Sequence, residues 1–125
     1  MTKLKIETLD FDHNIIASFH EMFQAVDIAL KKNTKGYFVA LNPEKIVNTY
    51  NKNNWKKIWS NALGIYVDGV GIVHAARILD NKTIERIFPL ESILRKLDDT
   101  KGRLFLFGSQ KEVLSNAVEK INNHY

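Results

Sequence analysis

The segment from Gly64 to Arg77, which reads GIYVDGVGIVHAAR, is the most informative part of this chain for predicting its architecture. The apolar run from Ile65 to Val67 is typical of the end of a buried strand, and an apolar helix start follows the two glycines. A strand that ends in Asp-Gly-x-Gly and leads into a helix places one carboxylate, that of Asp68, at the carboxyl edge of a sheet. Open α/β sheets bind their ligands at that edge.

The motif has two interpretations. Gly69 and Gly71 carry no side chains, so a substrate could approach the backbone closely beside Asp68. Alternatively, Asp68 is only a helix N-cap or a turn residue, because Asp-Gly is a common turn dipeptide. Spacing alone leaves both interpretations open.

A second strand is predicted from Tyr37 to Leu41, directly before Asn42 and Pro43. Proline suits the first turn of a helix, which makes Asn42 a candidate N-cap. The functional interpretation is that the Asn42 side chain points into a cleft at the sheet edge.

A third apolar run, from Arg103 to Phe107, predicts a fully buried strand. It leads through Gly108 and Ser109 into a helix over residues 113–121. Phosphate oxygens can bind at a helix N-terminus that follows such a small-residue turn, although one glycine is a weak signal. Since no further strand follows to pair beside it, we expect an open edge there and self-association of the chain.

Other segments complete the expected order of elements. Alternation predicts a first strand from Lys3 to Leu9. Apolar residues at three- and four-residue steps predict a helix from Ile15 to Leu30, capped by Asp12 or Asn14. Further helices are expected over residues 43–50, 55–62, 72–79 and 90–97, and the helix over 72–79 is apolar almost all round, which predicts that it is buried.

Strands that alternate with helices predict an α/β fold. We expect one domain over residues 1–125, a Rossmann-like three-layer sheet with mainly parallel strands whose C-terminal half is incomplete. The chain has no cysteine, no apolar run of about 18 residues and no signal peptide, so a cytoplasmic location is expected. His, Asp and Glu do not occur at metal-ligand spacing, and we expect no metal or other cofactor.

The net charge of +4 favours anionic partners: phosphates, nucleic acid or an acidic membrane face. Trp55 and Trp59 lie among lysines, a pattern that suits a stacking platform for single-stranded nucleic acid or a membrane contact. The alternative is that the tryptophans belong to the core and the lysines form a solvated surface.

Four segments in order carry a resemblance to a known family: VALNPE at 39–44, VDGVGIV at 67–73, IERI at 84–87 and RLFLFG at 103–108. Together they resemble the WecG/TagA/CpsF family of bacterial glycosyltransferases. The resemblance covers about residues 5–122, but only the first half to two-thirds of a typical member. It implies transfer of N-acetylmannosamine, its uronic acid or a related hexose to a lipid-linked precursor in surface polysaccharide or teichoic acid synthesis.

The resemblance also implies residue roles. Asp68 would be the general base that takes the proton from the acceptor hydroxyl as it attacks the anomeric carbon of the donor, in a metal-independent inverting displacement. Arg86 would stabilise the leaving diphosphate of a UDP-sugar, and Asn42 would hold sugar hydroxyls. Gly108 and Ser109 would lie near the nucleotide diphosphate.

The chain departs from the family pattern at several positions. Ala40 stands where the family usually has threonine, and Val67 where it usually has proline. Where the family has Gly-x-Asp, this chain has Pro89, Leu90 and Glu91, so that Glu91 is the carboxylate expected to contact substrate.

The expected partners are a nucleotide sugar, a lipid-linked sugar acceptor and a second copy of the chain. The protein would attach peripherally at the inner face of the cell membrane, where the acceptor lies. No specific nucleic acid is expected. The alternative function is a non-catalytic remnant, or an anion- or lipid-binding module of the same fold. Salt-dependent binding to acidic vesicles without affinity for sugar donors would favour that module.

Overall fold

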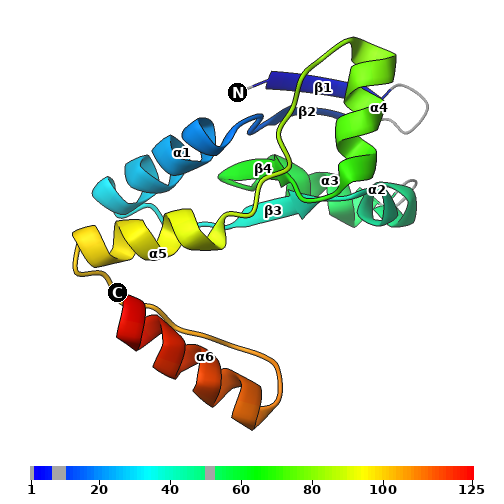
Figure 1. The fold of residues 1–125 in the computed structure, drawn as a ribbon. Helices are drawn as coiled ribbons and strands as arrows, with labels where there is room; N and C mark the ends of the chain where they lie inside the picture. Colours follow the sequence, from blue (N-terminus) through cyan, green and yellow to red (C-terminus); the bar gives the residue numbers. More distant parts are fainter. Residues whose placement is uncertain (1, 7–10, 50–52) are drawn as a thin grey trace. The chain divides into compact units, whose positions relative to one another are not determined.

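The computed structural model describes residues 2–6, 11–49 and 53–125 (Figure 1). Its contacts divide the chain into two compact units, Met1–Pro89 and Leu90–Tyr125, and each unit is described by itself. That all 125 residues form one domain stays a prediction.

The first unit is built on two parallel strands, β3 (Phe38–Leu41) and β4 (Gly64–Val67). Their register pairs Phe38 with Gly64 and Leu41 with Val67. Helices α2 (Pro43–Thr49) and α3 (Asn53–Ser60) connect the two strands, and α4 (Val70–Asp80) follows the second. Parallel strands need such a crossover. The prediction of a mixed α/β fold of Rossmann-like type is therefore confirmed.

An antiparallel pair, β1 (Thr2–Ile6) and β2 (Phe11–Ile15), precedes these elements. The sequence predicted only the first strand, whose expected end at residues 7–9 lies outside the described residues. The second strand was missed because its three central residues, Asp12 to Asn14, are all polar and hide the alternation. The prediction that Asp12 or Asn14 caps a helix was wrong, since cross-strand pairing holds both in β2.

The chain after β2 joins the pair to the parallel strands. Ile16 forms a parallel bridge with Tyr66, and its backbone N–H donates to the Ile65 carbonyl at 2.7 Å. The main core cluster combines strand residues with apolar residues of the three helices around β3 and β4. Its members are Ile15, Ala17, Leu41, Ile46, Trp59, Ile65, Val67, Ile72, Ala76 and Ile84. Trp59 is therefore a core residue, as one of the two interpretations proposed.

Helix α1 (Phe19–Lys31) begins with a capping box at Ser18 and Glu21. The Ser18 hydroxyl accepts the Glu21 N–H at 3.2 Å, and the Glu21 carboxylate accepts the Ala17 N–H at 2.9 Å. These bonds satisfy N–H groups that have no partner within the helix. In Figure 1, α1 lies on one side of β3 and β4, and α2 to α4 lie on the other.

We expect Ser18→Ala to lower the free energy of unfolding by about 1 kcal/mol, because the cap bond to the Glu21 N–H is lost. Urea unfolding followed by circular dichroism would measure the change. Ser115→Ala, at an exposed position within α6 (Lys111–His124), is the matched control and should change stability much less. Equal effects of the two substitutions would contradict the capping role.

Helix α4 is only partly covered, so the prediction of a fully buried helix was wrong. Ile72 and Ala76 are buried, whereas Ile78 is 80% exposed and Leu79 is 66% exposed. The reason is geometric: a helix beside one sheet face buries one stripe, and covering the opposite stripe would need another packing partner.

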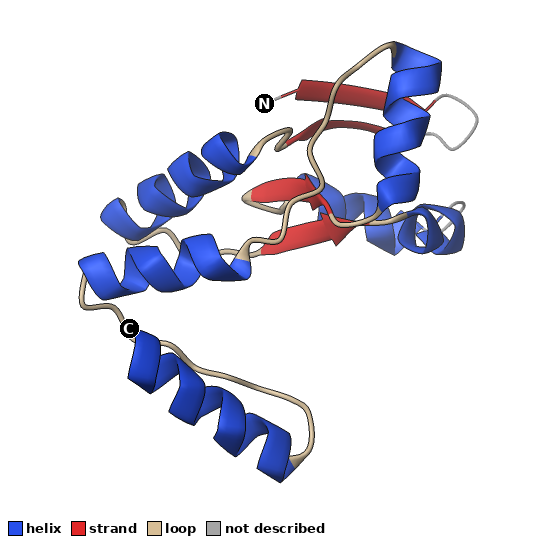
Figure 2. Ribbon diagram, viewed as in Figure 1, coloured by secondary structure: helices blue, strands red, loops and turns tan. Residues whose placement is uncertain are grey.

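In the second unit, the predicted strand from Arg103 to Phe107 is absent. The segment between α5 (Leu90–Asp99) and α6 is loop (Figure 2). Phe105 is 85% exposed and Phe107 is 93% exposed. An apolar run forms a strand only where a neighbouring strand pairs with it, and no described residue does so here. Self-association through this segment stays a prediction.

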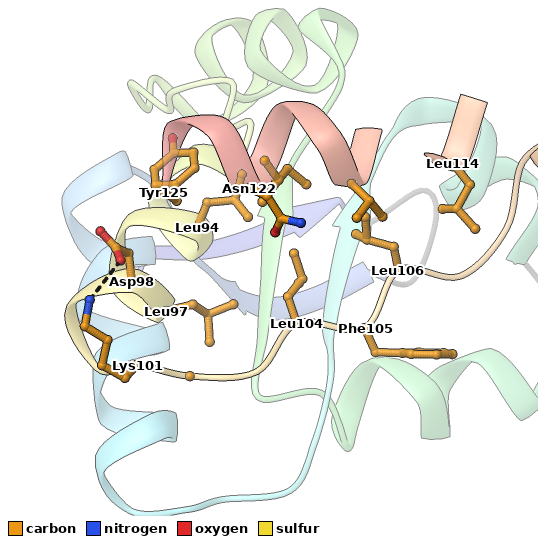
Figure 3. Close-up of a pocket in the computed structure, with 13 residues that line it drawn as sticks. Leu94, Leu97, Asp98, Lys101, Leu104, Phe105, Leu106, Leu114, Asn122 and Tyr125 are labelled. Carbon is orange, nitrogen blue, oxygen red and sulfur yellow. Dashed lines mark hydrogen bonds and ion pairs between the residues drawn. The ribbon is translucent and has the colours of Figure 1, made fainter. Parts of the chain in front are cut away.

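The same segment lines a groove of about 620 Å³ together with the two helices of the second unit (Figure 3). Leu94 and Leu97 of α5 face it beside Leu104, and Asp98 and Lys101 form an ion pair at its rim, with 3.4 Å between Oδ1 and Nζ. None of the predicted site residues is among the residues that line this groove.

In the described part of the chain, every helix is too short or too polar to cross a membrane.

Candidate functional site

The predicted site residues of the first unit meet at the carboxyl ends of β3 and β4. Asn42 directly follows Leu41, and Asp68 directly follows Val67, the residue paired with Leu41. The Asp68 N–H donates to the Leu41 carbonyl at 2.9 Å, so the pairing continues one residue beyond the strand. Asn42 and Asp68 therefore lie at the same edge of the sheet, where α/β folds bind ligands.

Asp68 does not cap the helix that follows it. The N-cap of α4 is Gly69, which has no side-chain cap bond. The Asp68 side chain is half-buried, and no donor among the described residues bonds to its carboxylate. The interpretation of Asp68 as a plain cap is therefore excluded, and its carboxylate is available to accept a proton or a hydrogen bond.

Asn42 does cap a helix. Its Oδ1 accepts the Lys45 backbone N–H at 2.8 Å at the start of α2, and the Lys45 ammonium donates to the Ala40 carbonyl at 2.9 Å. The capping interpretation is therefore confirmed, while contact of Asn42 with a sugar stays a prediction. These bonds also place a cation, Lys45, close to the end of β3, which the sequence analysis had not proposed.

Gly69 and Gly71 allow the two strand ends to approach each other. A Cβ on Gly71 would lie 2.8 Å from Cγ of Pro43, and one on Gly69 would lie 3.1 Å from Cδ of the same proline. Since the proline ring is rigid, a side chain at residue 71 would push the Asn42–Pro43 turn away. The glycines thus keep Asn42 close to Asp68, and their contact with a substrate stays a prediction.

Arg86 reaches the site because its segment is anchored on both sides. The Ile87 N–H donates to the Val67 carbonyl at 2.7 Å, and the Glu85 N–H donates to the Ala17 carbonyl at 2.8 Å. Arg86 Nε then donates to the Asp68 carbonyl at 3.0 Å. The structure therefore brings Arg86, Asp68 and Asn42 to one edge of the sheet, and the roles that the resemblance implies for Asp68 and Arg86 stay predictions.

Tyr66, which the sequence analysis did not single out, lies on β4, two residues before Asp68. Burial, and in second place the negative charge of Asp68, raise the pKa of the Tyr66 phenol above its ordinary value. The signal was available in the sequence, because residues two apart in a strand share one face. Tyr66 precedes Asp68 by two residues.

The raised pKa predicts a pH dependence of stability. The folded state holds the Tyr66 proton more tightly than the unfolded state, whose tyrosines titrate near pH 10. This stabilisation is present below about pH 10 and is lost as the pH rises through the folded-state pKa. We expect the difference in unfolding free energy between wild type and Tyr66→Phe to fall above about pH 10. Urea unfolding at a series of pH values measures it, and a flat difference curve would contradict the expectation.

Glu91, Gly108 and Ser109 lie in the second unit. The Glu91 carboxylate accepts two bonds from Arg95, at 3.1 Å from Nε and 2.7 Å from Nη2, and raises the pKa of that guanidinium. Gly108 and Ser109 have φ values of 110° and 67° and lie just before α6, at exposed positions. The predicted helix after this turn is confirmed, whereas contacts of the three residues with a substrate stay predictions.

A family model matches most of the chain. The model for the glycosyl transferase WecG/TagA/CpsF family covers residues 7–125. The chain belongs to this family.

Two curated relatives carry the same name, N-acetylglucosaminyldiphosphoundecaprenol N-acetyl-beta-D-mannosaminyltransferase. The protein from Bacillus spizizenii is 26% identical over 123 residues, which are 96% of this chain and 47% of the relative. The protein from Bacillus subtilis strain 168 is 28% identical over 88 residues, 68% of this chain and 34% of the relative. This member of the WecG/TagA/CpsF family thus spans about half the length of the first relative. No solved structure matches the chain.

The candidate site of this WecG/TagA/CpsF member combines the Asp68 carboxylate, the Arg86 guanidinium, the Asn42 amide and the Lys45 ammonium near the ends of β3 and β4. Within residues 2–6, 11–49 and 53–125, three or more His, Asp or Glu side chains do not gather where they could hold a metal ion. The groups that the site does offer are a proton acceptor, a cation and hydrogen-bonding groups.

Proposed function

We propose that this chain carries the acceptor-activating site of a glycosyltransferase. It would move N-acetylmannosamine, its uronic acid or a related hexose from a nucleotide-diphosphate sugar to a lipid-linked acceptor in surface polysaccharide or teichoic acid synthesis. Family membership and the names of the two relatives support this proposal. The main observation behind it is that the half-buried Asp68 side chain caps no helix and lies at the same sheet edge as Arg86 and Asn42.

In the proposed reaction, Asp68 takes the proton of an acceptor hydroxyl. The acceptor oxygen forms a bond to the anomeric carbon of the donor, and the bond from that carbon to the diphosphate oxygen breaks, with its electron pair leaving on the diphosphate. One carboxylate suffices for this inverting displacement, whereas a retaining double displacement needs a second group as nucleophile. A nucleotide diphosphate is a good leaving group and needs little protonation.

Arg86 is the proposed partner of the leaving diphosphate. Its Nε is engaged with the Asp68 carbonyl, and its other N–H groups have no bond to any residue that the structure describes. A guanidinium held by one N–H can present the others to phosphate oxygens. Stabilisation of the diphosphate by cations in place of a metal ion, and uridine as the nucleotide base, are parts of the proposal.

Arg86→Lys is expected to weaken binding of UDP-N-acetylmannosamine about tenfold or more. Lysine keeps the charge but cannot bond the Asp68 carbonyl and a phosphate through one planar group. Calorimetric titration with the nucleotide sugar measures the change. Arg77→Lys, at an exposed position on α4, is the control and should bind like wild type. Unchanged affinity of Arg86→Lys would contradict the proposed role.

The proposed function as a whole is tested by incubating the protein with α-linked UDP-N-acetylmannosamine and a short-chain analogue of N-acetylglucosaminyldiphosphoundecaprenol. Mass spectrometry detects the product, and NMR assigns its anomeric configuration. A β-linked product would support inverting transfer. Binding to acidic vesicles with neither transfer nor sugar affinity would instead support the lipid-binding module. Peripheral attachment at the inner membrane face is the location that a lipid-linked acceptor would require.

A further inference from the structure

We propose that Tyr66 is a substrate-positioning residue, whose hydroxyl donates a hydrogen bond to the acceptor sugar beside the hydroxyl that Asp68 deprotonates. The inference rests on the proposed function and adds a second contact point to it. Nothing in the family pattern quoted above includes this tyrosine.

The first argument is the direction of the side chains along β4. Ile65 and Val67 both belong to the core cluster, so their side chains share the buried face. Successive side chains of a strand alternate between faces, which places Tyr66 and Asp68 together on the opposite face. The bond from the Asp68 N–H to the Leu41 carbonyl keeps the backbone paired through this residue, so the alternation extends to it.

The second argument is the space beside the ring. Across the parallel ladder, Tyr66 pairs with Ala40 on β3, and its neighbour on the other side is Ile16. The side chain of Ala40 is a single methyl group, so it covers little of the half-buried phenol from the β3 side. In the proposal, the acceptor sugar lies at the carboxyl end of this face, next to both Tyr66 and Asp68.

The third argument is that the Tyr66 hydroxyl has no partner among the residues that the structure describes, although the side chain is half-buried. Tyr37 of the same unit differs, because its hydroxyl donates to the Ile58 carbonyl at 2.9 Å. A half-buried phenol generally finds a hydrogen-bond partner. A bound ligand would supply one here.

The two groups are chemically complementary. The Asp68 carboxylate only accepts, whereas a protonated phenol can donate. Among the described residues, Lys45 and Arg86 are charged groups whose side chains bond the backbone at these strand ends. A phenol of ordinary pKa is protonated at neutral pH, and burial together with the Asp68 charge raises the pKa of Tyr66 further, so its hydroxyl is a donor there. Residues two apart in a strand are separated by about 6.6 Å, which suits two contacts to one sugar ring.

The test compares calorimetric affinities for the short-chain acceptor analogue. We expect Tyr66→Phe to bind about tenfold more weakly than wild type, the usual effect of losing one ligand hydrogen bond. Tyr37→Phe is the matched control and should bind like wild type, because the Tyr37 hydroxyl that it removes donates to the Ile58 carbonyl. Wild-type affinity in Tyr66→Phe would overturn the inference and leave the proposed function standing. Absence of binding by the wild-type protein would overturn both.

A second measurement is independent of sugar. Absorbance titration of the tyrosines should show one phenol whose pKa falls in Asp68→Asn, and that transition should be missing in the Tyr66→Phe, Asp68→Asn double variant. This signature reports that the phenol lies close to the Asp68 carboxylate, which the inference requires, while the affinity comparison reports the contact with the sugar. If Asp68→Asn shifts no tyrosine, the two side chains do not face each other and the inference is wrong.

Discussion

Asp68→Asn is expected to lower the rate of sugar transfer by about 10²- to 10⁴-fold, the usual contribution of a general base. Asparagine has nearly the same shape and still accepts a hydrogen bond, but it cannot take up the proton of the acceptor hydroxyl. Since no donor in the described part of the chain bonds to the Asp68 carboxylate, the substitution breaks no hydrogen bond of that side chain with those residues. We therefore expect folding and acceptor binding to persist while turnover is lost.

The measurement is the initial rate of product formation with saturating donor and acceptor, together with the thermal midpoint of each variant. Asp99→Asn, which changes an exposed carboxylate at the end of α5, is the matched control and should retain the wild-type rate. If Asp68→Asn turns over at the wild-type rate, the general-base role is wrong, even if the chain binds both substrates.

Leu41→Ala is expected to lower the free energy of unfolding by about 3 kcal/mol, within the range for removing a fully buried leucine. Leu41 is completely buried at the end of β3, in the same cluster as Val67 and Ile72. Since small domains are stable by only about 5–15 kcal/mol, a loss of this size removes a large part of the total.

Urea unfolding gives the value, and Val47→Ala gives the control. Val47 lies on α2 and is 64% exposed, so its truncation should change stability by about 0.5 kcal/mol or less. Comparable losses in the two variants would show that the cluster around Leu41 does not dominate the stability of the first unit.

Much of the first unit could be predicted from local patterns. Apolar runs predicted β3 and β4, and Pro43 after Asn42 predicted the start of α2. The strand–Asp-Gly-x-Gly–helix order predicted that Asp68 lies at a sheet edge. These predictions hold because backbone preference, side-chain periodicity and helix capping act within a few residues of one another.

Predictions that depended on distant partners were less successful. The sequence showed that residues 103–107 are apolar, but their lack of a pairing neighbour leaves Phe105 and Phe107 exposed. The apolar composition of α4 did not show that one of its sides is uncovered. The polar segment β2 forms a strand because β1 pairs with it. That pairing cannot be recognised from the residues of β2 alone.

Local patterns along the chain predicted the types of most elements and the position of Asp68 after a strand, and motifs in a fixed order predicted membership of the glycosyltransferase family. That Gly69, and not Asp68, is the N-cap of α4, and that Arg86 bonds the Asp68 carbonyl, became visible only in the folded chain. The physical reason is that a motif specifies only the local backbone conformation. Whether a carboxylate is available depends on the groups that lie beside it in the folded protein, and strand pairing and packing bring those groups from other parts of the chain.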